Sequence, residues 1–293
     1  MDKNKKLMII LFVAMIFNSF TPIAIKLGLN ELPTMFFLGV RFLIAALAMS
    51  FFFRLKKENL KKNFFSGAIS LVTISLFFYS FKIFSPGIVN LISEVPFSIF
   101  LATFIFNEKM SRREATGVLG AFAGLFLVTS NVSLDNSHLL YIPLLASFMA
   151  GINVNIIKKV KLEVGELLLG RFLTIGIGAS IISYFFETGQ VEAVRNISDI
   201  AIFSFLWVLL YGTLIAKFVV SKAIVELPIH VVIPATMMLP PLVLIWDYFI
   251  FGNLFTFQQM LGVVIVLGGI FMAEHKSKKK EHHHHHKWLH RHH

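Results

Sequence analysis

Apolar stretches long enough to cross a lipid bilayer follow one another along almost the whole chain, from Leu7 to Ala273. A transmembrane helix needs about 20 predominantly apolar residues, and most of these stretches approach that length. They are too long and too uniformly apolar for the alternating strands of about ten residues that build an outer-membrane barrel. The sequence therefore predicts an all-α integral membrane protein with ten transmembrane helices, at about residues 7–27, 33–53, 64–81, 86–106, 115–130, 139–157, 167–186, 200–224, 231–251 and 257–273.

The low content of charged residues agrees with lipid as the main solvent. Charged residues make up 15% of the chain, against about 25% in soluble domains. The formal net charge is +11, but Lys and Arg fall in short clusters between apolar stretches, so we expect no nucleic-acid partner. The chain has no Cys, which removes disulfides and thiolate metal sites, and we expect neither a metal nor a cofactor.

The basic clusters predict how the chain crosses the membrane, because Lys and Arg are retained on the cytoplasmic side. One set of alternating loops carries several bases, apart from a weaker eighth-to-ninth link with Lys222, whereas the opposite set holds only Lys82 and Arg195. The clusters lie at residues 3–6, 54–62, 109–113, 158–161 and 276–280. We therefore expect a multi-pass protein of the inner (cytoplasmic) membrane with both termini in the cytoplasm.

Both ends of the chain carry segments that resemble processing or handling sequences. The first apolar stretch follows a basic start like a signal peptide, but it is long and lacks an A-x-A-like cleavage site, so we expect it to be the first span. Residues 276–293 form a basic tail in which the run His282–His286 is typical of a purification tag. We expect no functional role for this tail.

Two sequence signatures occur once in each half of the chain. Gly39-Val40-Arg41-Phe42-Leu43 in the second span corresponds to Leu169-Gly170-Arg171-Phe172-Leu173 in the seventh. The segment 96–124 matches 241–269, with proline, hydroxyl residue and glycines at constant spacing. The sequence thus predicts two related five-helix repeats, residues 1–134 and 135–275. An odd number of spans per repeat inverts the second copy relative to the first, as in many secondary transporters.

These residues resemble the EamA-like transporters of the drug/metabolite transporter superfamily. The resemblance rests on Ser19, on Lys26-Leu27-Gly28-Leu29, on Pro33, on Arg41-Phe42 and on the segment 96–117, and it spans nearly the whole membrane region. It implies a ten-helix bundle that works by alternating access, with a central cavity lined by the first, third, fourth, sixth, eighth and ninth helices. Members of the family move amino acids, other metabolites, nucleotide derivatives or drugs, mostly outward.

Glu94 is the leading candidate for a substrate-binding or proton-binding residue. An ionisable group inside the bilayer costs about 2.5 to 3.5 kcal/mol on insertion scales, so it calls for a partner or a function. Glu94 lies within the fourth span, two residues before Pro96, where a kink can free backbone carbonyls. Its carboxylate could bind a substrate ammonium or a coupling proton. The alternatives are a structural salt bridge to Arg41 and a pore-facing residue without a coupling role.

Three basic residues in the membrane also call for an interpretation. Arg41 and Arg171 hold equivalent places in the repeats, which favours a structural role such as holding a helix end through backbone carbonyls or a carboxylate. Lys217 in the eighth span either grips a carboxylate or reaches the cytoplasmic interface. Tyr211, six residues earlier, is a candidate for substrate binding on a different helix face.

Neutral polar residues at comparable depths form a second group of candidates for a small polar site. They are Asn18, Ser19, Tyr79, Asn153 and Asn155, although each alone is more often an interhelical hydrogen bond of about 0.6 kcal/mol. Pro22 after Thr21 predicts a hinge in the first helix, and Pro96 and Pro241 are candidates for structural or gating roles. We expect Lys26 to reach the lipid headgroups and Asp247 to belong to an interfacial aromatic belt.

Glycines in the fifth and tenth spans permit close helix approach, and they predict either packing between the repeats or a homodimer face. The function predicted is a secondary transporter that moves a small metabolite, an amino acid or related amphiphile, outward across the membrane. The alternative is a lipid or lipid-carrier flippase on the same fold. The sequence lacks the catalytic clusters of membrane enzymes, the repeated ring of an ion channel and the phosphate-binding loop of an ATPase.

Overall fold

A computed structural model gives the fold of residues 3–97, 101, 110–130, 137–160, 162–227, 232 and 235–274. All regular elements among these residues are helices, and no strand occurs among them. The helices are α1 Lys3–Asn18, α2 Thr21–Leu29, α3 Thr34–Ser50, η1 Lys57–Asn59, α4 Leu60–Ile83, α5 Pro86–Ser93, α7 Arg112–Thr129, η2 His138–Leu140, α9 Tyr141–Val160, α10 Val164–Phe186, α11 Gln190–Arg195, α12 Asp199–Trp207, the π-helix η3 Val208–Ile215, α13 Ala216–Glu226, α15 Leu239–Phe251 and α16 Phe257–Glu274.

The helices agree with the predicted all-α membrane fold, while the count of ten spans stays a prediction. Five apolar helices are long enough to cross a bilayer, at Lys6–Leu29, Lys57–Ile83, His138–Ile156, Val164–Phe186 and Asp199–Val220. Three shorter apolar helices cover Thr34–Ser50, Ala235–Phe251 and Phe257–Ala273. The turn at 107–109, most of 98–106 and the tail 276–293 lie outside the described residues.

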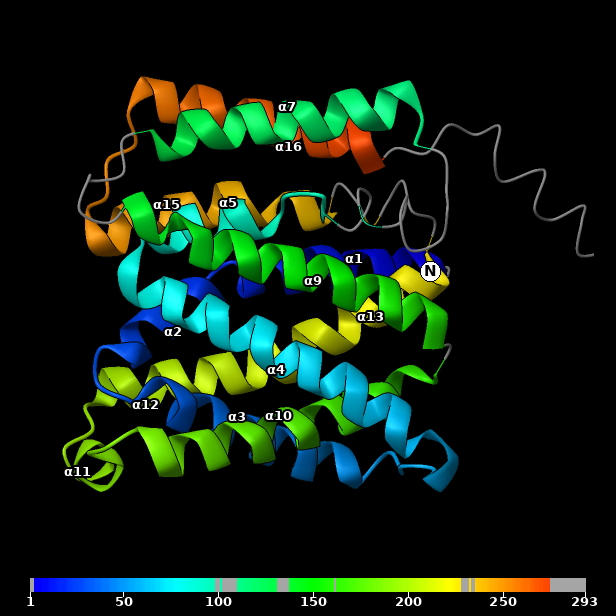
Figure 1. The fold of residues 1–293 in the computed structure, drawn as a ribbon, viewed down its shortest axis with the longest axis vertical. Coiled ribbons are helices and arrows are strands. Elements are labelled where there is room, and N and C mark those ends of the chain that lie inside the picture. The colour runs from blue at the N-terminus through cyan, green and yellow to red at the C-terminus, as the bar shows by residue number, and fades with distance from the viewer. Residues whose placement is uncertain are drawn as a thin grey trace, which may run out of the picture.

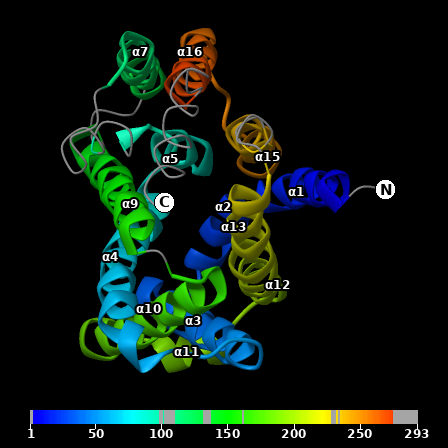
Figure 2. The ribbon, with the colours of Figure 1, turned by 90° about the vertical axis from the view of Figure 1, so that its right-hand side faces the viewer.

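The helices form a ring in which α7 and α16 lie at one end and α3 and α10 at the other (Figures 1 and 2). Equivalent helices of the two halves contact each other, since α3 packs on α10, α5 on α15 and α7 on α16. The pair α4 and α9, the third and sixth expected spans, has its counterpart in the contacts of α12 with α2 and of α13 with α1. This pattern is the one that a two-fold relation between the halves produces.

The two ends of the bundle can be told apart by their loops. The "α11 side" is the end that carries α11 and the links α2–α3, α4–α5 and α10–α12, and the "N-terminal side" is the opposite end, where α1 begins (Figure 1). The α11 side is the one that the charge pattern predicts to face outward, because its loops carry few bases.

The starts of α7 and α16 show the repeat at the level of single hydrogen bonds. Ser111 and Glu114 form a capping box in which the Glu114 N–H donates to Ser111 Oγ at 3.2 Å and the Ser111 N–H donates to Glu114 Oε2 at 2.6 Å. Thr256 and Gln259 exchange the same pair of bonds, at 3.3 and 2.9 Å. Each box satisfies backbone donors that a helix start leaves unpaired.

The glycines of α7 and α16 lie in the contact between these two helices. A Cβ atom on Gly124 would lie 2.6 Å from the backbone nitrogen of Val266, and one on Gly117 would lie 2.6 Å from the carbonyl oxygen of Gly269. Only glycine allows backbones this close. Of the two roles that the glycines predicted, the structure therefore shows packing between the repeats.

Two spans are interrupted where proline follows. The first span is divided at Ser19 and Phe20 into α1 and α2, because Pro22 has no N–H to donate to the preceding turn. The fourth span does not continue as one helix from residue 86, since α5 ends at Ser93 and Pro96 follows two residues after Glu94. Both interruptions therefore lie beside a proline, which cannot continue the backbone hydrogen bonds of the preceding turn.

Candidate functional site

An aromatic cluster joins the first, eighth and ninth spans at the break in the first helix. Its members are Phe17, Phe20, Trp207, Tyr211 and Trp246. Trp207 and Tyr211 stack with ring centroids 4.4 Å apart, and Phe17 stacks on Tyr211 at 5.4 Å. Phe20 meets Trp207 and Trp246 edge to face at 5.2 and 5.5 Å. Offset and edge-to-face pairs of this kind hold aromatic rings in defined positions.

The eighth span changes its helix type beside this cluster. The π-helix η3 follows α12 directly after Trp207, and Thr213 Oγ1 donates to the carbonyl of Val208, five residues earlier, at 2.9 Å. Gly212 lies in η3 against Thr21, where a Cβ atom would be 2.5 Å from Thr21 Cγ2. Single-turn π-helices occur frequently at functional sites, because they reposition side chains within an otherwise regular helix.

The cluster contains both satisfied and unsatisfied polar groups. Trp246 Nε1 donates to Ser19 Oγ at 3.1 Å, and Ser19 Oγ donates to the carbonyl of Ile16 at 2.6 Å. By contrast, Trp207 Nε1 and Thr21 Oγ1 are buried without a hydrogen-bond partner among the described residues. Buried polar atoms are nearly always paired, so an orphan donor marks a place for a ligand or a water molecule.

A buried polar network links the third, sixth and seventh spans. Ser70 Oγ accepts hydrogen bonds from Arg171 Nε at 2.9 Å and from Asn153 Nδ2 at 2.8 Å. It donates in turn to the carbonyl of Ser66, whose own hydroxyl lies 3.5 Å from Asn153 Oδ1. Arg171 is therefore held by a hydroxyl group rather than by the backbone carbonyl or carboxylate that we expected.

Arg41 is held by aromatic rings. Its guanidinium carbon lies 4.5, 4.8 and 5.7 Å from the ring centroids of Phe42, Phe78 and Phe37. The side chain is 4% exposed, and Nε has no hydrogen-bond partner among the described residues. Arg41 forms no salt bridge with Glu94, a contact that was one of the two alternatives for that carboxylate. Its guanidinium makes cation–π contacts instead.

Lys217 lies on α13, a helix that contacts α10, on which Arg171 lies. The Lys217 side chain is exposed and makes no hydrogen bond to another described residue. Its two predicted roles, gripping a carboxylate and reaching the cytoplasmic interface, both stay predictions.

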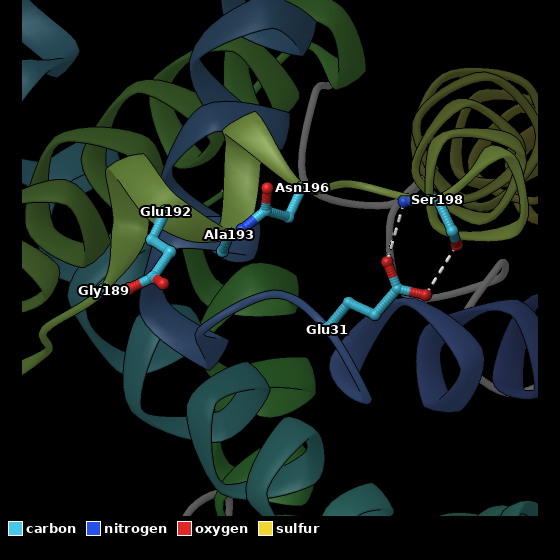
Figure 3. A pocket seen from close by; sticks show the side chains of 6 residues that line it. All are labelled: Glu31, Gly189, Glu192, Ala193, Asn196 and Ser198. Carbon is cyan, nitrogen blue, oxygen red and sulfur yellow. Dashed lines mark hydrogen bonds between the residues drawn. The ribbon is translucent and has the colours of Figure 1, made fainter.

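Carboxylates on the α11 side cap helices that belong to the other half of the chain. Glu187, which follows α10, accepts from the N–H groups of Met35 and Phe36 at 2.8 and 2.9 Å at the start of α3. Glu31, between α2 and α3, accepts from the N–H and the hydroxyl of Ser198 at 2.9 and 2.6 Å at the start of α12 (Figure 3). These hydrogen bonds hold the pKa of Glu31 below its usual value.

The Glu31–Ser198 contact lines a shallow pocket of about 370 Å³ whose other walls are Gly189, Glu192, Ala193 and Asn196 (Figure 3). A second pocket, of about 400 Å³, is apolar and is lined by Met237, Met238, Pro241, Leu242 and Phe271. Neither contains the buried polar groups described above. Among the described residues no group of three or more His, Asp or Glu side chains could hold a metal ion.

The predicted polar residues do not form a single site. Ser19 joins the aromatic cluster and Asn153 joins the Ser70 network, whereas Asn155 Nδ2 donates to the carbonyl of Gly151 in its own helix at 2.9 Å. Tyr79 is 46% exposed. Asn18 is the half-buried last residue of α1.

Glu94 is half-buried at the C-terminal end of α5, directly before the break at Pro96.

Two expectations about charged residues were wrong. Asp247 is fully buried rather than interfacial, and it accepts from the Gly87 N–H at 3.1 Å and from Asn253 Nδ2 at 2.9 Å at the start of α5. Lys26 donates to the carbonyl of Phe84, the residue after α4, at 2.7 Å instead of reaching the headgroups. Both side chains satisfy backbone groups at helix ends, which stabilises them away from water.

Sequence reasoning missed Trp207, Trp246 and Ser70. Aromatic residues are abundant in this chain, with 33 Phe alone, so a tryptophan in an apolar stretch is no signal by itself. The available signal was the scarcity of tryptophan, since only three occur and two of them contact Phe20 at the break in the first helix.

Comparisons with known proteins identify this multi-pass helical protein as a transporter rather than an enzyme. The model of the EamA-like transporter family matches residues 5–130 and again 137–274. The chain therefore belongs to the EamA-like transporter family. It is 22% identical over 265 residues to a probable amino-acid metabolite efflux pump of Salmonella typhimurium, an alignment that covers 85% of this chain and 88% of that protein.

The fold also occurs among solved structures. One crystal structure superposes with a TM-score of 0.65 at 12% identity, covering 92% of this chain and 97% of that one. At this level of identity the likeness concerns the fold alone.

Proposed function

We propose that this protein exports an amino acid or a related amphiphile across the cytoplasmic membrane by alternating access. In this proposal both termini lie in the cytoplasm, the α11 side faces outward, and the working units are the repeats 1–134 and 135–275. The relative in Salmonella typhimurium, named a probable amino-acid metabolite efflux pump, supports the substrate class. The observation that carries the proposal is the aromatic cluster with its orphan Trp207 N–H, placed where the broken first helix meets the π-helix η3.

The cluster suits an amphiphile because it offers flat apolar faces together with isolated polar atoms. Small-molecule sites are mostly apolar and aromatic, with a few polar groups that fix orientation. Thr21 Oγ1 and Trp207 Nε1 supply an acceptor and a donor that no described residue uses. Transport needs one half to move against the other, and helix interruptions at a midplane site are typical of secondary transporters.

The substrate class can be tested with purified protein in liposomes. We expect saturable counterflow of at least one apolar amino acid, and we expect Trp207→Leu to raise its half-saturating concentration about tenfold, the equivalent of about 1.4 kcal/mol. Tyr248→Leu is the matched control, since Tyr248 contacts Phe249 on its own helix instead of the cluster. Absence of saturable counterflow for every amino acid tried would contradict this proposal.

Proton coupling through Glu94 is a second part of the proposal. Glu94 lies at the end of α5 beside the break at Pro96, where a carboxylate can change its surroundings as the fourth span moves. We expect Glu94→Gln to abolish accumulation driven by a pH gradient while leaving substrate exchange intact. Accumulation by the variant at the wild-type level would exclude the coupling role.

A lipid flippase is the second candidate, favoured by the apolar pocket at Met237, Pro241 and Phe271. An acyl chain fits such a lining better than a zwitterion does. A dithionite assay with fluorescent lipid in the same liposomes separates the two functions, because a flippase equilibrates the lipid between leaflets and an amino-acid exporter does not. Any homodimer would need a surface other than the glycine faces of α7 and α16, which contact each other.

A further inference from the structure

The short helix α11 lies between the ends of two membrane-spanning helices. α10 ends at Phe186 and α12 begins at Asp199, and both belong to segments long and apolar enough to cross a bilayer. α10 has 23 residues, which at about 1.5 Å per residue gives a length slightly greater than the roughly 30 Å of a hydrocarbon core. The end of α10 and the start of α12 therefore lie at a membrane surface, and α11 connects them.

Hydrogen bonds hold α11 against the end of α10. Gln190, the first residue of α11, donates from Nε2 to the carbonyls of Ser183 and Glu187 at 2.9 and 2.8 Å. Gly189 turns the chain between the two helices with a φ of 79°, a conformation that glycine adopts without steric cost. As a result α11 runs across the ends of the long helices instead of extending away from them, and it is seen end-on in Figure 1. The helix therefore lies at the level of the membrane surface.

The side chains of α11 divide into an inner face, a polar face and an exposed apolar face. Ala193 packs against the hydrophobic core, and Glu192 lines the shallow pocket beside Glu31 (Figure 3). Val191 and Val194 are 75% and 50% exposed. They lie three residues apart and so share one side of the helix, which we call the valine face. The valine face is therefore directed away from the bundle, and it is apolar.

The valine face follows shortly after an exposed aromatic surface at the end of α10. Tyr184, Phe185 and Phe186 are between 70% and 82% exposed, and tyrosine is enriched where a membrane meets water. Arg195, the last residue of α11, is exposed as well. An arginine at such a place can lay its apolar stem on the hydrocarbon and hold its guanidinium among lipid phosphates. An apolar surface with a base at its edge is complementary to the headgroup region of a phospholipid membrane.

We propose that α11 is an interfacial helix that docks on the phospholipid membrane through Val191 and Val194, with Arg195 at the phosphate groups. Helices of this kind bury their apolar face about 5 to 10 Å into the boundary between headgroups and acyl chains. The docking fixes the level of the link that follows α11, and so of Ser198, whose contact with Glu31 joins the two halves. This inference goes beyond the proposed function, because it holds whichever molecule the protein moves.

Spin labels on single cysteines test the docking, because the chain contains no native Cys. Val191→Cys and Val194→Cys are labelled and reconstituted as full-length protein in liposomes of phosphatidylcholine and phosphatidylglycerol. Accessibility to oxygen, which concentrates in lipid, is then compared with accessibility to a nickel chelate, which stays in water. Leu119→Cys, on the outer helix α7, gives the reference for lipid, and Glu192→Cys, on the polar face of α11, is the matched control. All four side chains are exposed, so the labels leave the packing of the helices intact.

We expect the labels at both valines to show a ratio of oxygen to nickel accessibility several-fold above that at Glu192 and close to that at Leu119. A ratio at both valines equal to that at Glu192 would place the valine face in water and overturn the proposal. Low accessibility to both reagents would overturn it too, because protein, such as a second copy of this chain, would then cover the valine face. The measurement needs no transported substrate, so its outcome is independent of whether the protein exports an amino acid.

Discussion

Glu31 and Ser198 show how one exposed carboxylate can join the two halves of the molecule. The Glu31 side chain accepts two hydrogen bonds from Ser198, whose own Oγ caps α12 by accepting from the Ala201 N–H at 3.2 Å. A carboxylate at a helix start also interacts favourably with the helix dipole. The residue thus stabilises the start of α12 and fixes the link α2–α3 against it.

This contact predicts a pH dependence of stability. The pKa of Glu31 is lowered from an ordinary value of 4.5 by its hydrogen bonds to Ser198. A lowered folded-state pKa gives stabilisation that is complete above the unfolded-state pKa and is lost as the pH falls through the folded-state value. We expect Glu31→Gln to lower the melting temperature at pH 7, with a loss of unfolding free energy below about 1 kcal/mol because the group is exposed.

The difference between wild type and Glu31→Gln should shrink as the pH falls from the ordinary pKa of 4.5 through the lowered folded-state pKa, because protonation of Glu31 then makes both side chains neutral. Melting temperatures of the two proteins between pH 3.5 and 7 in the same detergent provide the measurement. Glu192→Gln is the control, since Glu192 lines the same pocket without bonding to Ser198. A difference that stays constant over this range would contradict the electrostatic origin.

At the scale of residues, the sequence predicted where charged residues lie better than it predicted which residues contact them. The repeated Arg-Phe-Leu signature singled out Arg41 and Arg171, and both lie inside the bundle. Their partners, three phenylalanine rings and a serine, come from other helices, so no local pattern could have named them. The burial of Asp247 was not predicted for the same reason. Gly87, whose N–H donates a hydrogen bond to the Asp247 carboxylate, lies 160 residues away in the chain.

At the scale of elements, the packing of α7 on α16 depends on the absence of side chains. A methyl group on Gly124 would lie 2.6 Å from the Val266 backbone nitrogen, so the helices must separate to hold it. Overpacking of this kind costs about 1 to 3 kcal/mol. We expect Gly124→Ala to lower the melting temperature of the purified protein by several degrees.

Gly268→Ala is the matched control for Gly124→Ala. A Cβ atom on Gly268 meets nothing within 4 Å, although Gly268 lies on α16 next to the contact. Alanine also has a higher helix propensity than glycine by about 1 kcal/mol. The control should therefore be neutral or slightly stabilising. Equal destabilisation by both changes would show that the α7–α16 contact is not what the glycines serve.

The approach of Thr21 to Gly212 gives a second prediction for elements. A Cβ atom on Gly212 would lie 2.5 Å from Thr21 Cγ2, so Gly212→Ala should push the π-helix η3 away from the start of α2. We expect counterflow to fall because Tyr211 of the aromatic cluster lies on η3 and Phe20 of the cluster directly precedes α2. Thr21→Ala removes the obstructing methyl group and should restore much of the lost activity in the double variant.

The comparison of single and double variants in liposomes is a double-mutant cycle, in which residues in contact show non-additive effects. Thr21→Ala alone also reports on the orphan Thr21 hydroxyl, so its own effect is measured first. Additive losses in the double variant would indicate that Gly212 acts through something other than its contact with Thr21.

Most helices could be predicted because hydrocarbon thickness dictates how many apolar residues a span requires. The interruptions were only partly predictable. Pro22 indicated the hinge between α1 and α2, but the π-helix η3 lies in a uniformly apolar stretch where periodicity carries no information. The end of α5 at Ser93 is explained by Pro96, which follows three residues later. The sequence predicted a kink beside Glu94 and Pro96, but it placed that kink within a fourth span that continues to residue 106.

At the scale of the whole molecule, the inverted repeat explains which helices touch. Equivalent helices pair across the halves at α3 with α10, α5 with α15 and α7 with α16. The sequence predicted the repeat from two signatures, but it could not decide whether the glycine faces met within one chain or between two. That choice depends on where the loops carry each helix, which periodicity does not encode.

The same arrangement indicates which contacts change during alternating access and which do not. Glu31 and Ser198 join the start of α12, which ends with Trp207 of the aromatic cluster, to the link α2–α3. Ser130 and Gln258, whose side chains lie 3.0 Å apart, join α7 to α16 on the same side of the molecule. If the α11 side opens to release substrate, the first contact must break, whereas the glycine-packed second pair moves as a unit.

Cysteine pairs test this distinction directly, because the chain contains no native Cys. Bridging Glu31→Cys and Ser198→Cys with a short bis-maleimide should hold the α11 side closed and arrest counterflow in liposomes. The same reagent on Ser130→Cys and Gln258→Cys should leave counterflow near the level of the unbridged protein, and so should either single variant after treatment. Transport that survives quantitative bridging of the first pair would mean that the α11 side does not open there. Arrest by both pairs would mean that α7 and α16 move apart as well, and the rigid-pair assignment would then fail.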